Sequence, residues 1–260
     1  MLINKYLVPL SKIFVPLWVY VLILGSIELF LKSINIKQYI FPAPSSIFIE
    51  IVKSFPILIY NVAVSFSIAI ASFALGIVIA FVSAVLLARL PILRRVALPG
   101  LIAMQAIPLV ALAPYFLIWF GPGPFSRVLL STLLVFFPAL LIMFNGLRAR
   151  NKDTELLFKS IRISEGRMFR HVTIPSAVPA LASAMEVTAA LSVIGAVVAE
   201  LAGQPNGIGF VIMQATYVYD TPRVFAVLTL GAVASLALYY VVGMAGQRLR
   251  QKFAFHYGTN

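Results

Sequence analysis

The chain of 260 residues contains no cysteine, eight acidic residues and two histidines. The absence of cysteine excludes disulfides and thiolate metal sites. The two histidines, His171 and His256, are far apart in the sequence, and neither has a second histidine nearby. The sequence therefore predicts no metal centre.

Hydrophobic residues make up 62% of the chain, and the mean hydropathy is +1.02. The apolar runs reach about 20 residues, which is the length of a membrane-spanning helix, whereas the strands of a transmembrane barrel are shorter and alternate. These runs predict an all-α polytopic membrane protein, a single domain over residues 1–260 with about six transmembrane helices in the lipid bilayer. We expect the helices at roughly residues 13–31, 59–88, 96–120, 127–147, 177–201 and 224–246.

The net charge of +12 comes from basic residues that flank the apolar runs and do not form one continuous face. It therefore indicates membrane topology and not nucleic-acid binding. With the predicted spans, fifteen basic residues lie on one side of the membrane: Lys5, Lys12, Arg89, Arg94, Arg95, Arg148, Arg150, Lys152, Lys159, Arg162, Arg167, Arg170, Arg248, Arg250 and Lys252. The other side holds five, namely Lys32, Lys37, Lys53, Arg127 and Arg223. Because basic loops remain in the cytoplasm, both termini are expected there.

Residues 148–175 form the one sizeable cytoplasmic loop of this topology. The loop is too short for a catalytic domain but long enough for one or two short helices. Its stretch 153–168 mixes apolar and charged residues, as is typical of an amphipathic helix that fills a groove on a partner or lies on lipid headgroups. The chain has no Gly-x-x-x-x-Gly-Lys-Ser/Thr loop, so it cannot bind ATP by that route.

Several short motifs follow one another between residues 40 and 245. They are Phe41-Pro42-Ala43-Pro44-Ser45, Gln105-Ala106-Ile107-Pro108, Ala111-Leu112-Ala113-Pro114, Ile118-Trp119-Phe120-Gly121, Phe136-Phe137-Pro138, Gly146-Leu147, the stretch 169–179, Ala199-Glu200 and Asn206-Gly207-Ile208-Gly209. Their order and spacing resemble the permeases of ABC importers, in particular those for sulfonates, taurine, nitrate and thiamine-type precursors. The stretch 169–179 resembles the end of the loop that docks the ATPase in that family.

The resemblance implies a permease subunit of an ATP-driven importer for a small polar nutrient in the bacterial cytoplasmic (inner) membrane. Two permease copies would form the pathway at their interface. A cytoplasmic ABC ATPase dimer, which binds ATP and Mg, would dock on a coupling helix between the fourth and fifth spans. An extracytoplasmic binding protein would deliver the substrate. The chain itself would be no enzyme and need no cofactor. A proton- or ion-coupled carrier that uses membrane glutamates, and a non-transporting membrane scaffold, are the alternatives.

The docking loop departs from the family pattern at two places. The family's Glu-Ala-Ala falls on Leu156-Leu157-Phe158, and its glycine falls on Arg162. The candidates for coupling to the ATPase are Leu156, Leu157, Phe158, Lys159, Arg162, Ser164 and Glu165.

Five polar or helix-breaking residues in the predicted spans are candidates for lining the pathway or contacting substrate: Gln105, Pro108, Glu186, Glu28 and Glu200. A carboxylate in lipid is costly and usually faces a bundle interior or a cavity. The alternatives are a hydrogen-bonded glutamate that joins helices, an interfacial charge for Glu28 or Glu200, and an interhelical hydrogen bond for Gln105. Because the spans lack Lys and Arg apart from Arg127 at a helix edge, a neutral or cationic solute such as a heterocyclic vitamin precursor fits better than a sulfonate or nitrate.

Overall fold

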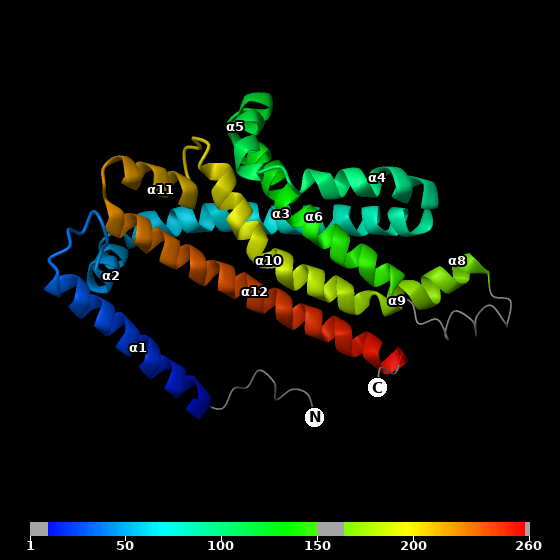
Figure 1. Cartoon of the computed structure of the whole chain (residues 1–260), viewed down its shortest axis with the longest axis horizontal. Helices are drawn as coiled ribbons and strands as arrows, with labels where there is room; N and C mark the ends of the chain where they lie inside the picture. Colours follow the sequence, from blue (N-terminus) through cyan, green and yellow to red (C-terminus); the bar gives the residue numbers. More distant parts are fainter. Residues whose placement is uncertain (1–9, 150–163, 258–260) are drawn as a thin grey trace.

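The long apolar runs form four helices that lie side by side along the longest axis of the molecule (Figure 1). They are α3 (Phe55–Arg89), α6 (Pro124–Arg148), α10 (Val178–Glu200) and α12 (Thr221–Tyr257), in a computed structural model that describes residues 10–149 and 164–257. Helix α10 packs against α6 and α12, and α3 packs against α6. Within the described residues these four helices are long and apolar enough to cross a membrane.

Small residues set the distance between the long helices. A Cβ on Gly76 of α3 would come within 2.6 Å of the Val135 side chain of α6. A Cβ on Gly195 of α10 would come equally close to the Ser131 hydroxyl of α6. Lipid is as apolar as a helix surface, so close packing of this kind, and not a hydrophobic driving force, holds such helices together.

The predicted third span at 96–120 is two helices. Helices α4 (Pro91–Met104) and α5 (Leu109–Phe120) meet at an angle of 98° across residues 105–108. Proline has no backbone N–H and disfavours a helical conformation of the residue before it, so Pro108 ends one helix and begins another. The apolar run at 96–120 is therefore interrupted at Pro108 and is not one continuous helix.

The bent pair α4–α5 would be a fifth span if it crosses as one unit. Helix α1 (Leu10–Ser33) covers the first predicted span but is not among the four helices that are long and apolar enough to cross a membrane. The number of six spans therefore stays a prediction. Helix α12 continues well beyond the predicted residue 246, and its 37 residues extend about 55 Å, against a hydrocarbon layer of about 30 Å.

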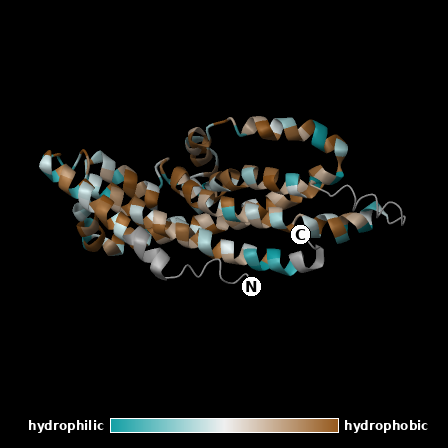
Figure 2. Cartoon of the chain, turned by 60° about the horizontal axis from the view of Figure 1, so that its bottom comes forward, coloured by the Kyte–Doolittle hydropathy of each residue, from teal (hydrophilic) through white to brown (hydrophobic). Residues whose placement is uncertain are grey.

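Short helices mark the two ends of the bundle (Figure 1). Helices α2 (Pro44–Lys53) and α11 (Ile208–Tyr217) lie at one end, which we call the α11 end. Helix α8 (Glu165–Met168), a π-helix (Phe169–Thr173) and α9 (Ile174–Ser176) lie at the other, the α9 end. Figure 2 shows hydrophobic residues over most of the helix surfaces and hydrophilic residues gathered near the C-terminal part of α12.

Candidate functional site

Glu200, the last residue of α10, is fully buried at the α11 end. The Ser65 hydroxyl of α3 donates to its carboxylate, with oxygen–oxygen distances of 2.7 and 2.8 Å, and the Gly209 N–H donates at 3.0 Å. Arg127 of α6, also buried, places Nη1 3.8 Å from Glu200 Oε1. A buried carboxylate is tolerated when it is paired and hydrogen-bonded, so these contacts hold the ends of α3, α6 and α10 together.

The same side chains cap the start of α11. The Gly207 N–H donates to Asn61 Oδ1 at 2.7 Å, and the Ile208 N–H donates to Ser65 Oγ at 2.8 Å. The N–H of the following residue, Gly209, donates to the Glu200 carboxylate. The first N–H groups of a helix lack partners within the helix and favour nearby negative charge. Here α3 and α10 supply both the hydrogen-bond acceptors and the negative charge. The N–H groups at the start of α11 are therefore already paired and are not free to bind an anionic substrate.

Arg127 also ties two loops together. Its Nη1 donates to Asn206 Oδ1 at 2.9 Å, and its Nε donates to the Gly123 carbonyl at 3.2 Å. The Gln204 side chain in turn accepts the Gly123 N–H at 3.1 Å. The loop before α6 and the loop between α10 and α11 are thereby joined. We call Asn61, Ser65, Arg127, Glu200 and Asn206 the Glu200 cluster.

Glu186 on α10 faces α12, where Arg250 Nη2 lies 2.8 Å from its Oε1. Both side chains are partly buried. This contact favours the interpretation of Glu186 as a hydrogen-bonded glutamate that joins two helices. Arg250 lies beyond the last predicted span, which ends near residue 246. The sequence therefore predicted no cation near Glu186. The extension of α12 brings the arginine back into reach.

Glu28 of α1 contacts the start of α2. Its carboxylate lies 2.7 Å from Lys32 Nζ and accepts both the Ser45 N–H at 3.0 Å and the Ser45 hydroxyl at 2.6 Å. Glu28, Glu186 and Glu200 thus each have a cation and a hydrogen-bond donor beside them. The expectation of a neutral or cationic solute depended on spans without cations near these glutamates, so the three ion pairs remove its basis.

A further carboxylate, which the sequence analysis did not consider, fastens α2 to α12. Glu50 Oε1 accepts the Ser54 hydroxyl at 2.6 Å and Arg223 Nε at 3.0 Å. Burial alone would raise the pKa of Glu50, but the hydrogen bonds from Ser54 and Arg223 and the positive charge of Arg223 outweigh it and lower the pKa. The α11 end is therefore held by two separate groups of charged side chains.

Gln105 and Pro108 lie in the break between α4 and α5, and both are exposed in the isolated chain. None of the residues of α4, all of which the structure describes, is buried. In α5, which is likewise fully described, only Ala113 is buried. The two candidates thus lie together on a part of the chain that has few neighbours within its own protomer.

Two of the coupling candidates fall within the described residues. Ser164 precedes α8 and Glu165 begins it, and both are exposed at the α9 end. Met168 and Phe169, which follow, are buried against the bundle. The remaining candidates, Leu156, Leu157, Phe158, Lys159 and Arg162, lie outside the described residues.

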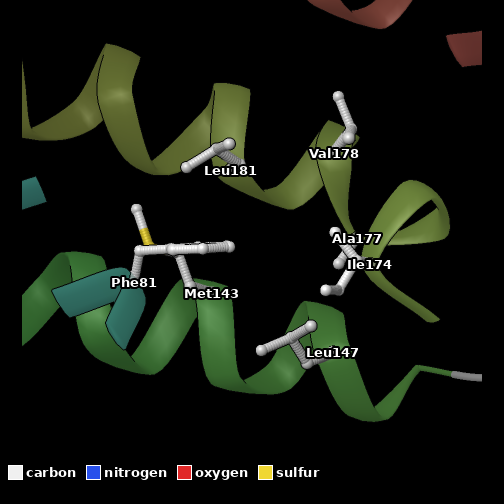
Figure 3. A pocket seen from close by; sticks show the side chains of 7 residues that line it. All are labelled: Phe81, Met143, Leu147, Ile174, Ala177, Val178 and Leu181. Carbon is white, nitrogen blue, oxygen red and sulfur yellow. The ribbon is translucent and has the colours of Figure 1, made fainter. Parts of the chain in front are cut away.

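A small cavity of about 60 Å³ lies beside this segment (Figure 3). Helices α3, α6 and α10 and the residues around α9 contribute its lining, which is apolar throughout: Phe81, Met143, Leu147, Ile174, Ala177, Val178 and Leu181. A lining without polar groups cannot orient a polar solute, so this cavity is no substrate site.

Comparison with known proteins identifies relatives over most of the chain. The family of binding-protein-dependent transport system inner membrane components matches residues 72–253. A probable ABC transporter permease of Haemophilus influenzae is 31% identical over 80% of this chain and 85% of its own. The formylaminopyrimidine transport permease ThiX of Halalkalibacterium halodurans is 30% identical over 73% of this chain and 76% of its own. The riboflavin transport permease RibX of Chloroflexus aurantiacus is 34% identical over 58% of this chain and 57% of its own.

The fold also matches solved structures. A chain of the MetNI methionine ABC transporter, in an inward facing conformation, aligns with a TM-score of 0.64 over 77% of this chain and 98% of its own. The sequences of the two chains are 19% identical, so this likeness concerns the fold.

The Glu200 cluster leads to a prediction about stability. The Glu200→Ala variant should lose about 3–5 kcal/mol of unfolding free energy, because it leaves Arg127 and the start of α11 buried without their carboxylate. Denaturation of the purified protein in detergent measures this loss. The matched control is Gln214→Ala on the exposed side of α11, which should stay within about 0.5 kcal/mol of the wild type. Equal midpoints for the two variants would show that the cluster does not stabilise the fold.

Proposed function

The chain belongs to the family of binding-protein-dependent transport system inner membrane components, and we propose that two copies of it form the translocation pathway of an ATP-driven importer. Members of this family are the permease subunits of ABC importers for small nutrients, and the chain is a multi-pass membrane protein. The proposal concerns the position of the pathway, the orientation in the membrane, the source of energy and the class of solute.

The break between α4 and α5 supports this position of the pathway. Residues 105–108 interrupt an otherwise apolar segment, and Gln105 and Pro108 are exposed there. Irregular backbone at membrane depth is tolerated where protein covers it or where it lines a water-filled cavity, because lipid cannot satisfy its polar groups. The N–H groups of residues 105–107 donate to carbonyls of α4, but the described residues leave the Gln105 and Pro108 side chains exposed. A second copy and an aqueous pathway between the two copies would cover them.

The proposed orientation places the α9 end in the cytoplasm. Basic residues end or follow several long helices there, with Arg89 at the end of α3, Arg148 at the end of α6 and Arg248 and Arg250 near the end of α12. The positive-inside rule then assigns the α11 end to the outside. There the binding protein would meet the loops that Arg127 and Gln204 join.

The energy would come from a cytoplasmic ATPase dimer that contacts the loop 148–175. The apolar side chains Leu156, Leu157 and Phe158 would fill a groove on the ATPase, and Lys159, Arg162, Ser164 and Glu165 would form its polar rim. The absence of a phosphate-binding loop in this chain supports a separate ATPase. The carrier alternative needs glutamates that are free to exchange protons, whereas Glu28, Glu186 and Glu200 all have partners.

We assign the solute to small polar nutrients of the kinds that the relatives transport. The names of these relatives cover a formylaminopyrimidine, riboflavin, aliphatic sulfonates and taurine. With the three glutamates paired, the backbone and amide groups near Gln105 are the polar groups best placed to meet a solute. Such groups recognise a solute through hydrogen bonds and need no net charge on it.

The pathway assignment predicts the accessibility of position 105. Because the chain has no native cysteine, Gln105→Cys introduces a single thiol. A water-soluble, membrane-impermeant maleimide should label it in reconstituted vesicles. The control is Leu236→Cys, at an exposed site within the unbroken helix α12, which should stay unlabelled in lipid. Labelling of Leu236→Cys but not of Gln105→Cys would contradict this position of the pathway.

The docking assignment predicts that Leu157→Asp or Phe158→Asp releases the ATPase while the permease still inserts. Burying an unpaired charge in an apolar groove costs several kcal/mol, which is enough to dissociate the complex. Co-purification of the ATPase with an affinity-tagged permease measures the loss. Asn151→Asp, the same added charge near the start of the loop, is the control that should retain the ATPase. An unchanged complex with both aspartate variants would disprove docking at these residues.

The proposed function is tested by uptake into vesicles that hold the permease, its ATPase and the binding protein. Uptake of radiolabelled pyrimidine, flavin or sulfonate should require ATP on the ATPase side. It should be absent when a proton gradient is imposed without ATP. Uptake driven by the gradient alone would support the carrier alternative.

A further inference from the structure

Helix α4 joins the end of α3 to the break at residues 105–108. It follows α3 after the single residue Leu90, at the α9 end of the bundle. One side of α4, with Ala97, Leu98 and Leu101, packs against a buried cluster that includes Leu87 of α3. Because no residue of this fully described helix is itself buried, the position of α4 depends on the end of α3 and on that cluster.

Phe169 is the member of this cluster that comes from the segment after the proposed ATPase contact. Its side chain is 5% exposed, and the guanidinium carbon of Arg89 lies 4.2 Å from the centre of its ring. A guanidinium at this distance over an aromatic face is attracted by the negative charge density of the ring. Arg89 is the last residue of α3, two residues before α4 begins. The contact therefore joins the loop segment to the α3–α4 turn.

Three features distinguish the segment that begins at Phe169. A π-helix runs from Phe169 to Thr173, a form that is rare and often found at functional sites. The buried Thr173 hydroxyl has no hydrogen-bond partner among the described residues. The apolar cavity borders the next residues, Ile174 and Ala177 (Figure 3). The cavity leaves room on one side of these residues, while α6 and α10 still pack closely where Gly146 meets Ala180.

We infer that Arg89 and Phe169 are a positioning pair that couples the ATPase contact to the pathway. When the loop segment is displaced, Phe169 carries Arg89 with it, the α3–α4 turn follows, and α4 moves the break at 105–108. The cavity beside Ile174 and Ala177 gives the segment room to move without unfolding α10. This inference rests on the proposed function, because it needs both an ATPase at the loop and a pathway at the break.

The test uses the complete complex of permease, ATPase and binding protein in vesicles and measures solute transported per ATP hydrolysed. The variants Arg89→Gln and Phe169→Leu should co-purify with the ATPase and hydrolyse ATP as the wild type does. Transport per ATP should fall at least about fivefold, the lower end of usual coupling between sites. The double variant should lose no more transport per ATP than either single variant, because both substitutions remove the same Arg89–Phe169 contact. Arg89→Lys, which keeps a cation over the ring, should retain most of the transport.

The matched control is Arg95→Gln, which removes an exposed arginine near the same turn and should transport as the wild type does. If Arg89→Gln and Phe169→Leu match this control, or if their losses add in the double variant, the inference is wrong although ATP-driven uptake by the wild type still stands. If the wild type shows no ATP-driven uptake, the proposed function fails and the inference with it. Should Phe169→Leu prove unstable in a melting experiment, the Arg89 variants decide the outcome.

Discussion

A backbone polar group left unpaired in the hydrocarbon of a membrane is costly, and two departures from continuous helix in the described part of this chain meet that constraint differently. Where α10 ends and α11 begins, Asn61, Ser65 and Glu200 take up the free N–H groups. Where α4 ends and α5 begins, the N–H groups of residues 105–107 donate only to carbonyls of α4, and the described residues leave Gln105 and Pro108 exposed. The first departure is buried within one protomer. The second, under the proposed function, would be covered by a partner copy and by the water of the pathway.

The two ends of the bundle differ in how their polar groups are arranged. At the α11 end, charged side chains from α6 and α10 and polar side chains from α3 meet in the Glu200 cluster, and Glu50 with Arg223 fastens α2 to α12. At the α9 end, the segment 169–177 contains a π-helix, a buried Thr173 hydroxyl without a partner among the described residues, and part of the lining of an apolar cavity. Under the proposed function, the ATPase would act at the α9 end and the binding protein at the α11 end.

Membrane carboxylates were the weakest basis for predicting function. A glutamate in an apolar run is costly to place in lipid, but a cation on a neighbouring helix offsets that cost. Arg250 was assigned to a loop because the apolar run ends near residue 246, yet the helix continues and returns its guanidinium to Glu186. Helix length beyond the hydrophobic run is set by tertiary packing and propensity, neither of which hydropathy reports. The Arg127–Glu200 contact joins residues 73 positions apart, and sequence order alone could not place them together.

The sequence by itself determined the all-α membrane class, the approximate positions of the long helices and the family resemblance. These follow from local features, since a run of apolar residues and a short motif can be read without knowing their neighbours. The right-angled break at residues 105–108, helix α11, the pairings of Glu186 and Glu200 and the Arg89–Phe169 contact were decided only by the tertiary structure. Proline signals that a helix is disturbed, but the angle depends on what the two halves pack against. Charge pairing between helices depends on which helix faces reach each other, and that is a property of the packed bundle.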